Sequence, residues 1–185
     1  MQYLVASGVP STQLPPGCQL VAGSQMMSFE EPWSFGEPLI ARLADGTNLD
    51  ALKTIVGADA FLVEGILEPG QGQAFCIGAH MMRDPEGFKP YAAGVPDVIK
   101  NYGCRYIARG GKVTPVTGSF VPDRAVLMEF PTADEAVRFY FSDAYAPLLK
   151  IRLRTTDPRF VLMARSGQLP DSALGVIATK LRARG

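Results

Sequence analysis

The sequence contains a single histidine, His80, so any histidine-based proton transfer has to use it. His80 lies in an apolar run and shares one face of the expected strand with Cys76. It is either an acid or base in a pocket or a hydrogen-bonded residue of the core or of an interface. A nucleophilic Cys76 or Cys104 would need a nearby base and a lowered pKa, and His80 could be that base for Cys76.

Two charged residues, Arg109 and Glu129, interrupt strands that are otherwise apolar. Buried charges are costly unless they are paired. The two side chains therefore either pair with each other across a hairpin or bind a polar ligand in a pocket between sheet and helices. Tyr91 and Tyr140 lie on two expected helices, and their phenols either point into the same cavity or belong to core aromatic residues with a hydrated hydroxyl.

The remaining composition argues against several classes of site. One histidine, with carboxylates that lack ligand spacing, predicts no metal site. Gly110-Gly111 follows a strand but leads into a hairpin rather than a helix, so no phosphate loop is expected, and no cofactor either. Any chemistry expected of this chain is therefore carried out by its side chains, without a metal ion or a cofactor.

Charge and cysteine content limit the partners and the compartment. Eighteen basic residues balance eighteen acidic ones, which disfavours nucleic-acid binding. No apolar run reaches the roughly 20 residues of a membrane span, and residues 1–5 lack the regions of a signal peptide. Cys18, Cys76 and Cys104 form no close-spaced pair, which is typical of free thiols in a reducing compartment. We expect a cytoplasmic protein.

The second half of the chain reads as a complete β-α-β-β-α-β unit. Alternation and apolar runs predict four strands, at 74–82, 104–112, 124–130 and 159–164. A helical stripe follows Asp84 and ends at Gly103, with Pro96 expected to kink or interrupt it. Thr132 and Glu135 form a capping box that begins a second helix, and a short helix is expected from Ser142 toward Arg154. This order packs two helices on one face of an antiparallel sheet, an α+β ferredoxin-like fold.

The opposite face of that sheet needs a cover of its own. All four strands are apolar on both sides, and an exposed apolar face of that size would promote association. The cover comes either from the same chain or from a second copy.

Several motifs in this half resemble the family called domain of unknown function 1330, of the dimeric α/β-barrel superfamily. They are residues 105–111 (RYIARGG), 122–124 (PDR), 129–131 (EFP) and 139–145 (FYFSDAY), within a match to about 73–165. The resemblance implies a ferredoxin-like fold whose bare sheet face packs against a second copy. It implies no established reaction, because the superfamily holds monooxygenases, isomerase-like enzymes and ligand-sensing modules.

Residues 1–70 are similar to a shortened, diverged copy of the same unit. One constant shift aligns Ala6, Gly8, Val9, Pro10, Gly17, Cys18 and Ala22 with Ala92, Gly94, Val95, Pro96, Gly103, Cys104 and Ala108. Residues 38–43, 49–55 and 61–66 then take the places of the third strand, second helix and fourth strand. The copy lacks a first strand in this alignment, and Pro15-Pro16 should prevent its first helix. Three parts result: the diverged half 1–70, the complete domain 73–165 and a docking helix at 171–185.

Two functional hypotheses follow from these parts. In the first, the chain is a cofactor-independent enzyme for a small molecule, with Arg109 as anchor, Glu129 and Tyr140 beside it, and His80 or Tyr91 moving a proton. In the second, it is a non-catalytic ligand-binding or assembly module whose diverged half has become structural. We expect either a pseudo-dimer within one chain or a homodimer of the complete halves.

Overall fold

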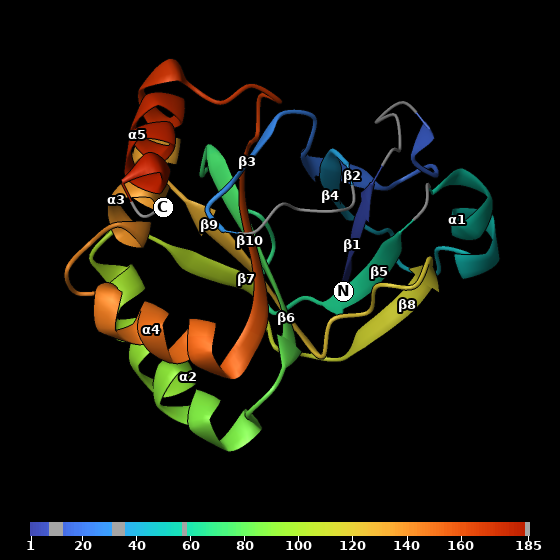
Figure 1. Cartoon of the computed structure of the whole chain (residues 1–185). Coiled ribbons are helices and arrows are strands. Elements are labelled where there is room, and N and C mark those ends of the chain that lie inside the picture. The colour runs from blue at the N-terminus through green and yellow to red at the C-terminus, as the bar shows by residue number, and fades with distance from the viewer. Residues whose placement is uncertain (8–12, 31–35, 57–58, 184–185) are drawn as a thin grey trace.

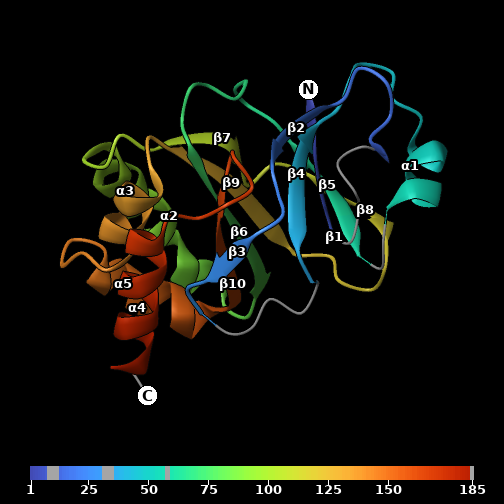
Figure 2. The same ribbon diagram turned by 90° about the horizontal axis from the view of Figure 1, so that it is seen from above.

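The computed structural model describes residues 1–7, 13–30, 36–56 and 59–183. Two five-stranded sheets lie face to face at the centre of the molecule (Figures 1 and 2). Helices α2, α3, α4 and α5 cover the outer face of one sheet, and α1 lies on the outer side of the other. The elements in chain order are β1 (Gln2–Ser7), β2 (Gln19–Ala22), β3 (Met26–Ser28), β4 (Pro38–Arg42), α1 (Leu49–Ile55), β5 (Ala60–Glu64), β6 (Ala74–Met82), α2 (Pro85–Lys100), β7 (Arg105–Arg109), β8 (Val113–Thr117), β9 (Arg124–Phe130), α3 (Ala133–Tyr140), α4 (Ala146–Thr155), β10 (Thr156–Ala164) and α5 (Asp171–Arg182).

Both sheets share one strand order. The second sheet runs β3-β10-β6-β9-β7, so the four strands of the predicted domain stand in the order fourth, first, third, second. The first sheet runs β2-β4-β1-β5-β8, which is the same order for the four strands of residues 1–70. Each sheet is antiparallel throughout. The predicted α+β ferredoxin-like fold is confirmed, and the shared order supports the proposal that residues 1–70 are a diverged copy.

One part of the sequence alignment is wrong. The first half does have a first strand, β1, whereas the alignment placed its Ala6 opposite Ala92 of helix α2. Gly8, Val9 and Pro10 lie outside the described residues. From Gly17 onward the alignment fits, since it matches β2 with β7 and β4 with β9. The described part of the connection between β1 and β2, residues 13–18, contains no α-helix, as Pro15-Pro16 predicted.

The halves exchange their fifth strands. β3 belongs to the connection between β2 and β4, yet it pairs with β10 of the second sheet. β8 belongs to the equivalent connection between β7 and β9, and it pairs with β5 of the first sheet. Each half therefore supplies one edge of the other half's sheet.

The apolar core between the sheets provides the expected cover. Phe75, Ile77 and Ala79 point from β6 toward the first sheet, which contributes Tyr3 and Phe61 among others. These side chains are almost fully buried. The cover comes from the same chain, so the pseudo-dimer arrangement is the one that the structure adopts.

Helix α2 continues through Pro96, so of the two predicted effects, a kink or an interruption, the interruption does not occur. A proline removes the bond to the carbonyl four residues earlier, here that of Ala92. The Arg109 guanidinium donates to this carbonyl at 2.9 Å and replaces the missing N–H. The buried stripe of the helix, Phe88, Tyr91, Val95 and Ile99, packs against the sheet and stabilises the continuous helix.

The other predicted elements of this half are present, but β7 ends at Arg109 rather than at 112 and β10 begins at Thr156 rather than at 159. The connection after β7 contains a strand that was not predicted, β8. Strand β9 has the predicted bounds, and α4 covers the expected short helix. The Thr132 hydroxyl accepts the Glu135 amide at the start of α3, as a capping residue should. Within the described residues, no helix is both long and apolar enough to cross a membrane.

We expect Phe75→Ala to lower the free energy of unfolding by about 3–5 kcal/mol, because it opens a cavity between the sheets. Urea unfolding followed by circular dichroism measures this loss. Leu153→Ala, at a side chain that is 40% exposed, is the matched control and should change little. The strand exchange further predicts one cooperative transition, and two separate transitions would contradict it.

Candidate functional site

Arg109 contacts the backbone of helix α2 and lines none of the pockets formed by described residues. It is exposed at the end of β7, donates to Ala92 and lies with its guanidinium 5.0 Å from the ring centre of Tyr106. Of the two arrangements expected from the sequence, the pair of Arg109 and Glu129 does not form. The β7–β9 register places Arg105 opposite Glu129 and Arg109 opposite Val126.

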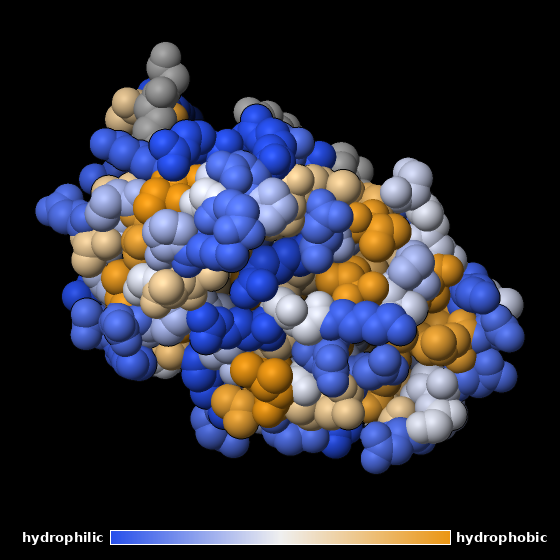
Figure 3. All heavy atoms as spheres, turned by 90° about the horizontal axis from the view of Figure 1, so that it is seen from below, coloured by the Kyte–Doolittle hydropathy of each residue, from blue (hydrophilic) through white to orange (hydrophobic). Residues whose placement is uncertain are grey.

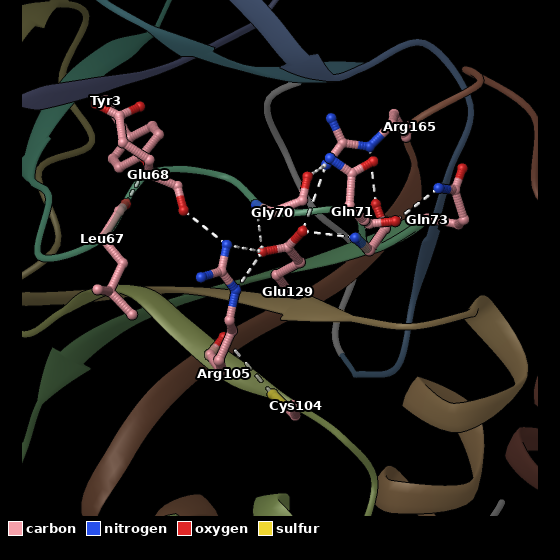
Figure 4. Close-up of polar contacts among 11 residues, drawn as sticks. Tyr3, Leu67, Glu68, Gly70, Gln71, Gln73, Cys104, Arg105, Glu129 and Arg165 are labelled. Atoms are coloured by element: carbon pink, nitrogen blue, oxygen red, sulfur yellow. Dashed lines mark hydrogen bonds and ion pairs between the residues drawn. The ribbon is translucent and has the colours of Figure 1, made fainter.

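Glu129 is the centre of a clamp on the linker that joins the two halves (Figure 4). Its carboxylate is 2% exposed and accepts the amides of Gly70 at 2.9 Å and Gly72 at 2.7 Å. Arg105 binds one carboxylate oxygen at 2.6–2.7 Å, and Arg165 approaches the other at 3.4 Å. Both oxygens of Glu129 thus have a backbone and a guanidinium partner, as a buried structural charge requires.

The same two arginines extend the clamp along the linker. Arg165 donates to the carbonyls of Gly72 and Gly70 at 2.8 and 2.9 Å, and Arg105 donates to that of Glu68 at 2.7 Å. The Gly72 backbone approaches so closely that a Cβ there would lie 2.4 Å from the Cγ of Glu129. The Gly-Gln-Gly sequence of the linker is explained by this close approach.

A second group of polar side chains is buried between the second sheet and its helices. It contains His80, Tyr91 and Tyr140, which the sequence analysis singled out, and Glu30, Tyr145 and Arg152, which it missed. We call these six residues the buried cluster.

Arg152 of α4 is the charged centre of the buried cluster. It is 0% exposed and pairs with Oε1 of Glu30, whose side chain is 5% exposed. The same Glu30 oxygen accepts the Tyr140 hydroxyl at 2.7 Å. The guanidinium carbon lies 4.9 Å from the ring centre of Phe160, 5.8 Å from that of Tyr91 and 5.9 Å from that of Tyr145. These rings partly offset the loss of hydration of the cation.

Most buried polar atoms without a partner belong to this cluster. Among the described residues, five buried side-chain nitrogens or oxygens have no hydrogen-bond partner. Four of them are Oε2 of Glu30, Nδ1 of His80, and Nε and Nη1 of Arg152. An unpaired buried polar group costs about 1–3 kcal/mol, and more when it is charged. Buried polar atoms of this kind are satisfied in proteins by ordered water or by a bound molecule, so the buried cluster is the candidate functional site.

His80 is neutral in this environment. Burial lowers its pKa well below the ordinary value, and the positive charges of Arg152 and Arg124 lower it further. Its ring centre lies 6.1 Å from that of Phe88, on the helix side of β6. Burial also raises the pKa of the Cys76 and Cys104 thiols, so neither thiol is ionised at neutral pH.

The phenols of the cluster are held by neighbours on other elements. The hydroxyls of Tyr91 and Tyr145 lie 3.3 Å apart, which joins α2 to the start of α4. Burial raises the pKa of Tyr145 well above its ordinary value, so that its phenol stays neutral. Tyr140 stacks on Phe29 at 4.2 Å.

Glu30 reaches the cluster from the first half of the chain. It follows β3, whose pairing with β10 brings it next to α3 and α4. A sequence signal for Arg152 existed, since Leu149, Arg152 and Thr155 fall at three-residue steps on the buried face of α4. Glu30 had no comparable signal, because its contact depends on the strand exchange.

Four surface pockets are lined by described residues, and none of the six residues of the buried cluster lines them. One, of about 600 Å³, lies at the end of the first sheet and is lined by residues 1–2, 43–47, 49, 64, 112 and 114. Another, of about 310 Å³, lies beside the Glu129 clamp. In the described part of the chain, no group of three or more His, Cys, Asp or Glu is placed to hold a metal ion.

Comparison with known proteins finds one matching family and several solved structures that resemble this chain. The model of a family described as "Domain of unknown function (DUF1330)" matches residues 73–165. No curated protein matches the sequence. The structure of a major regulator of staphylococcal pathogenesis is similar, with 12% identity over 88% of this chain and 98% of that chain and a TM-score of 0.49. An anthrone oxidase-like protein matches with 9% identity over 88% of this chain and 89% of that chain, with a TM-score of 0.44.

We expect Glu129→Gln to destabilise the protein by about 3–5 kcal/mol, because it leaves Arg105 and Arg165 without their anion. Chemical denaturation at pH 7.5 measures the loss. Glu64→Gln, an exposed carboxylate at the end of β5, is the control and should leave the midpoint unchanged. Equal midpoints for both variants would show that the clamp does not stabilise the fold.

We expect the stability to fall by about 1.4 kcal/mol between pH 7.5 and pH 5.5 because of His80. The unfolded chain takes up a proton near pH 6.5, whereas the folded chain does not. His80 therefore does not destabilise the protein above pH 6.5, and its destabilising effect grows as the pH falls below that value. Urea titrations at both pH values should show this slope in the wild type and lose it in His80→Gln. A wild-type midpoint that is equal at both pH values would mean that folded His80 binds a proton.

Proposed function

Because this chain belongs to the family described as domain of unknown function (DUF1330), which names no reaction, we propose a function from the buried cluster. The chain binds a small polar molecule between the second sheet and its helices. Arg152 holds an oxygen of that molecule, in the anchoring role first assigned to Arg109.

The observation that carries this proposal is the state of Arg152. A guanidinium has five N–H donors, and only Nη2 has a described partner. A fully buried cation with unpaired donors is unfavourable for folding. Side chains of this kind are common where a ligand completes the hydrogen bonding.

His80 is the candidate proton acceptor, and its lowered pKa makes it a weak base that would release the proton again readily. A neutral imidazole with an unpaired Nδ1 can take a proton from a bound molecule, and Arg152 can stabilise the negative charge left on its oxygen. The charge of Arg152 also affects the pKa of His80, so the two groups act within one electrostatic environment. The reaction class proposed is cofactor-independent proton transfer on a small molecule.

A non-catalytic binding or assembly module is the second candidate. Phe29, from the first half, stacks on Tyr140 and packs against Phe160, which fills part of the space that a ligand would need. This packing favours a diverged half that has become structural.

A homodimer, expected from the resemblance to dimeric barrels, stays a prediction. The sheet face that would form it is already covered within the chain. On the face drawn in Figure 3, apolar residues form separate small patches between polar ones. A homodimer would have to use another surface. The free cysteines fit the cytoplasmic location that we propose.

We expect a screen of small carbonyl compounds, phenols and carboxylic acids to find compounds that raise the unfolding temperature of the wild type. At about 100 times its Kd, a ligand stabilises by about 2.7 kcal/mol. The double variant Arg152→Met/Glu30→Gln removes the anchor without leaving Glu30 as an unpaired buried charge, and it should weaken binding by about tenfold or more.

Arg109→Met is the matched control, since this exposed cation lies outside the buried cluster. This variant should bind the same compounds with the same affinity as the wild type. Compounds that bind the double variant as well as the wild type would contradict the proposed site. So would a screen in which no compound stabilises the wild type.

A further inference from the structure

We infer that Glu30, supplied by the first half of the chain, restricts the site of Arg152 to uncharged molecules. This inference rests on the proposed function and adds the class of ligand. It makes Glu30 a residue that determines specificity, although it lies outside the family match at 73–165.

The position of Glu30 is fixed by the backbone before it. Ser28 pairs with Val161, and the Phe29 amide donates to the Phe160 carbonyl at 2.9 Å. The Phe29 ring is stacked on Tyr140. The carboxylate is thus delivered to Arg152 by strand pairing and ring packing, not by a freely moving side chain.

Among the described residues, the formal charges inside the buried cluster are one positive and one negative. Arg152 and Glu30 form an ion pair, burial keeps His80 neutral by lowering its pKa, and burial keeps the Tyr145 phenol neutral by raising its pKa. Arg124 is near enough to lower the pKa of His80, but it is only half-buried, so solvent screens it. A ligand carboxylate would have to lose its hydration in a dry site whose single buried cation already has an anion.

A neutral molecule with a carbonyl and a hydroxyl matches the unpaired atoms. Nε and Nη1 of Arg152 can donate to a carbonyl oxygen. Oε2 of Glu30 and Nδ1 of His80 can accept from a hydroxyl. Neither bond requires a ligand charge, so the unpaired atoms and the zero net charge point to the same class of molecule.

Removal of the Glu30 carboxylate should convert the site into an anion site. In Glu30→Ala, Arg152 is left without an anion beside a space of side-chain size. Propionate replaces the lost carboxylate, and propionamide has the same shape without the charge. We expect propionate to stabilise Glu30→Ala with an apparent Kd about tenfold lower than that of propionamide.

The measurement is the unfolding temperature at constant ionic strength as each compound is titrated. The wild type should show no preference for propionate, and Glu30→Ala/Arg152→Met should lose the preference that Glu30→Ala gains. If Glu30→Ala does not distinguish the two compounds, or if the wild type prefers propionate equally, the inference is overturned.

Glu30→Gln provides a second test that does not depend on the folding of Glu30→Ala. The amide keeps the shape and an acceptor for Tyr140 but removes the charge. Its affinity for carboxylic acids relative to their amides should rise about tenfold over that of the wild type, and an unchanged ratio would contradict the inference.

The two proposals fail separately. Rescue by propionate with no Arg152-dependent ligand of the wild type would remove the proposed function and leave the charge assignment standing. Arg152-dependent ligands that are themselves carboxylates would support the site and overturn its restriction to neutral molecules.

Discussion

The packing of one apolar sheet face against another determines the architecture of this chain. Strand β6 turns Cys76 toward the helices and Phe75 and Ile77 toward the first sheet, so neither face can contact water. Helices cover one face, and the sheet of residues 1–70 covers the other. The exchange of β3 and β8 follows from this arrangement, because strands at the rim of two facing sheets can pair with either one.

Two buried carboxylates, those of Glu129 and Glu30, differ in how completely their hydrogen bonds are satisfied. Glu129 has a backbone and a guanidinium partner for each oxygen and secures the linker. The pair of Glu30 and Arg152 is equally buried but keeps three unpaired atoms among the described residues. A buried network in which every polar atom is paired stabilises the fold. A network with unpaired atoms destabilises it, so its presence calls for a functional explanation. This contrast separates the structural charge from the candidate site.

The sequence predicted the second half well because its signals are local. Alternation along the strands, the Thr132 cap of α3 and the stripe of α2 depend on neighbours within a few residues. The Glu135 carboxylate, expected to complete a capping box, pairs with Arg138 instead. The errors arose where contacts between residues far apart in the sequence determine the structure. Pro96 is tolerated because Arg109 reaches its orphaned carbonyl. The pairing register of β7 and β9, which one sequence does not reveal, places Arg105 and not Arg109 opposite Glu129. Glu30 and Arg152 lie 122 positions apart, beyond any pattern that one sequence displays.

The covalent link between the facing sheets also has a consequence for the protein at low abundance. A barrel built from two separate chains comes apart on dilution, since its closure depends on their concentration. Here the short linker at Gly70–Gly72, held by Glu129 and the two arginines, keeps the second sheet at a high effective concentration beside the first. Closure is therefore a property of each single molecule and does not depend on the concentration of the protein.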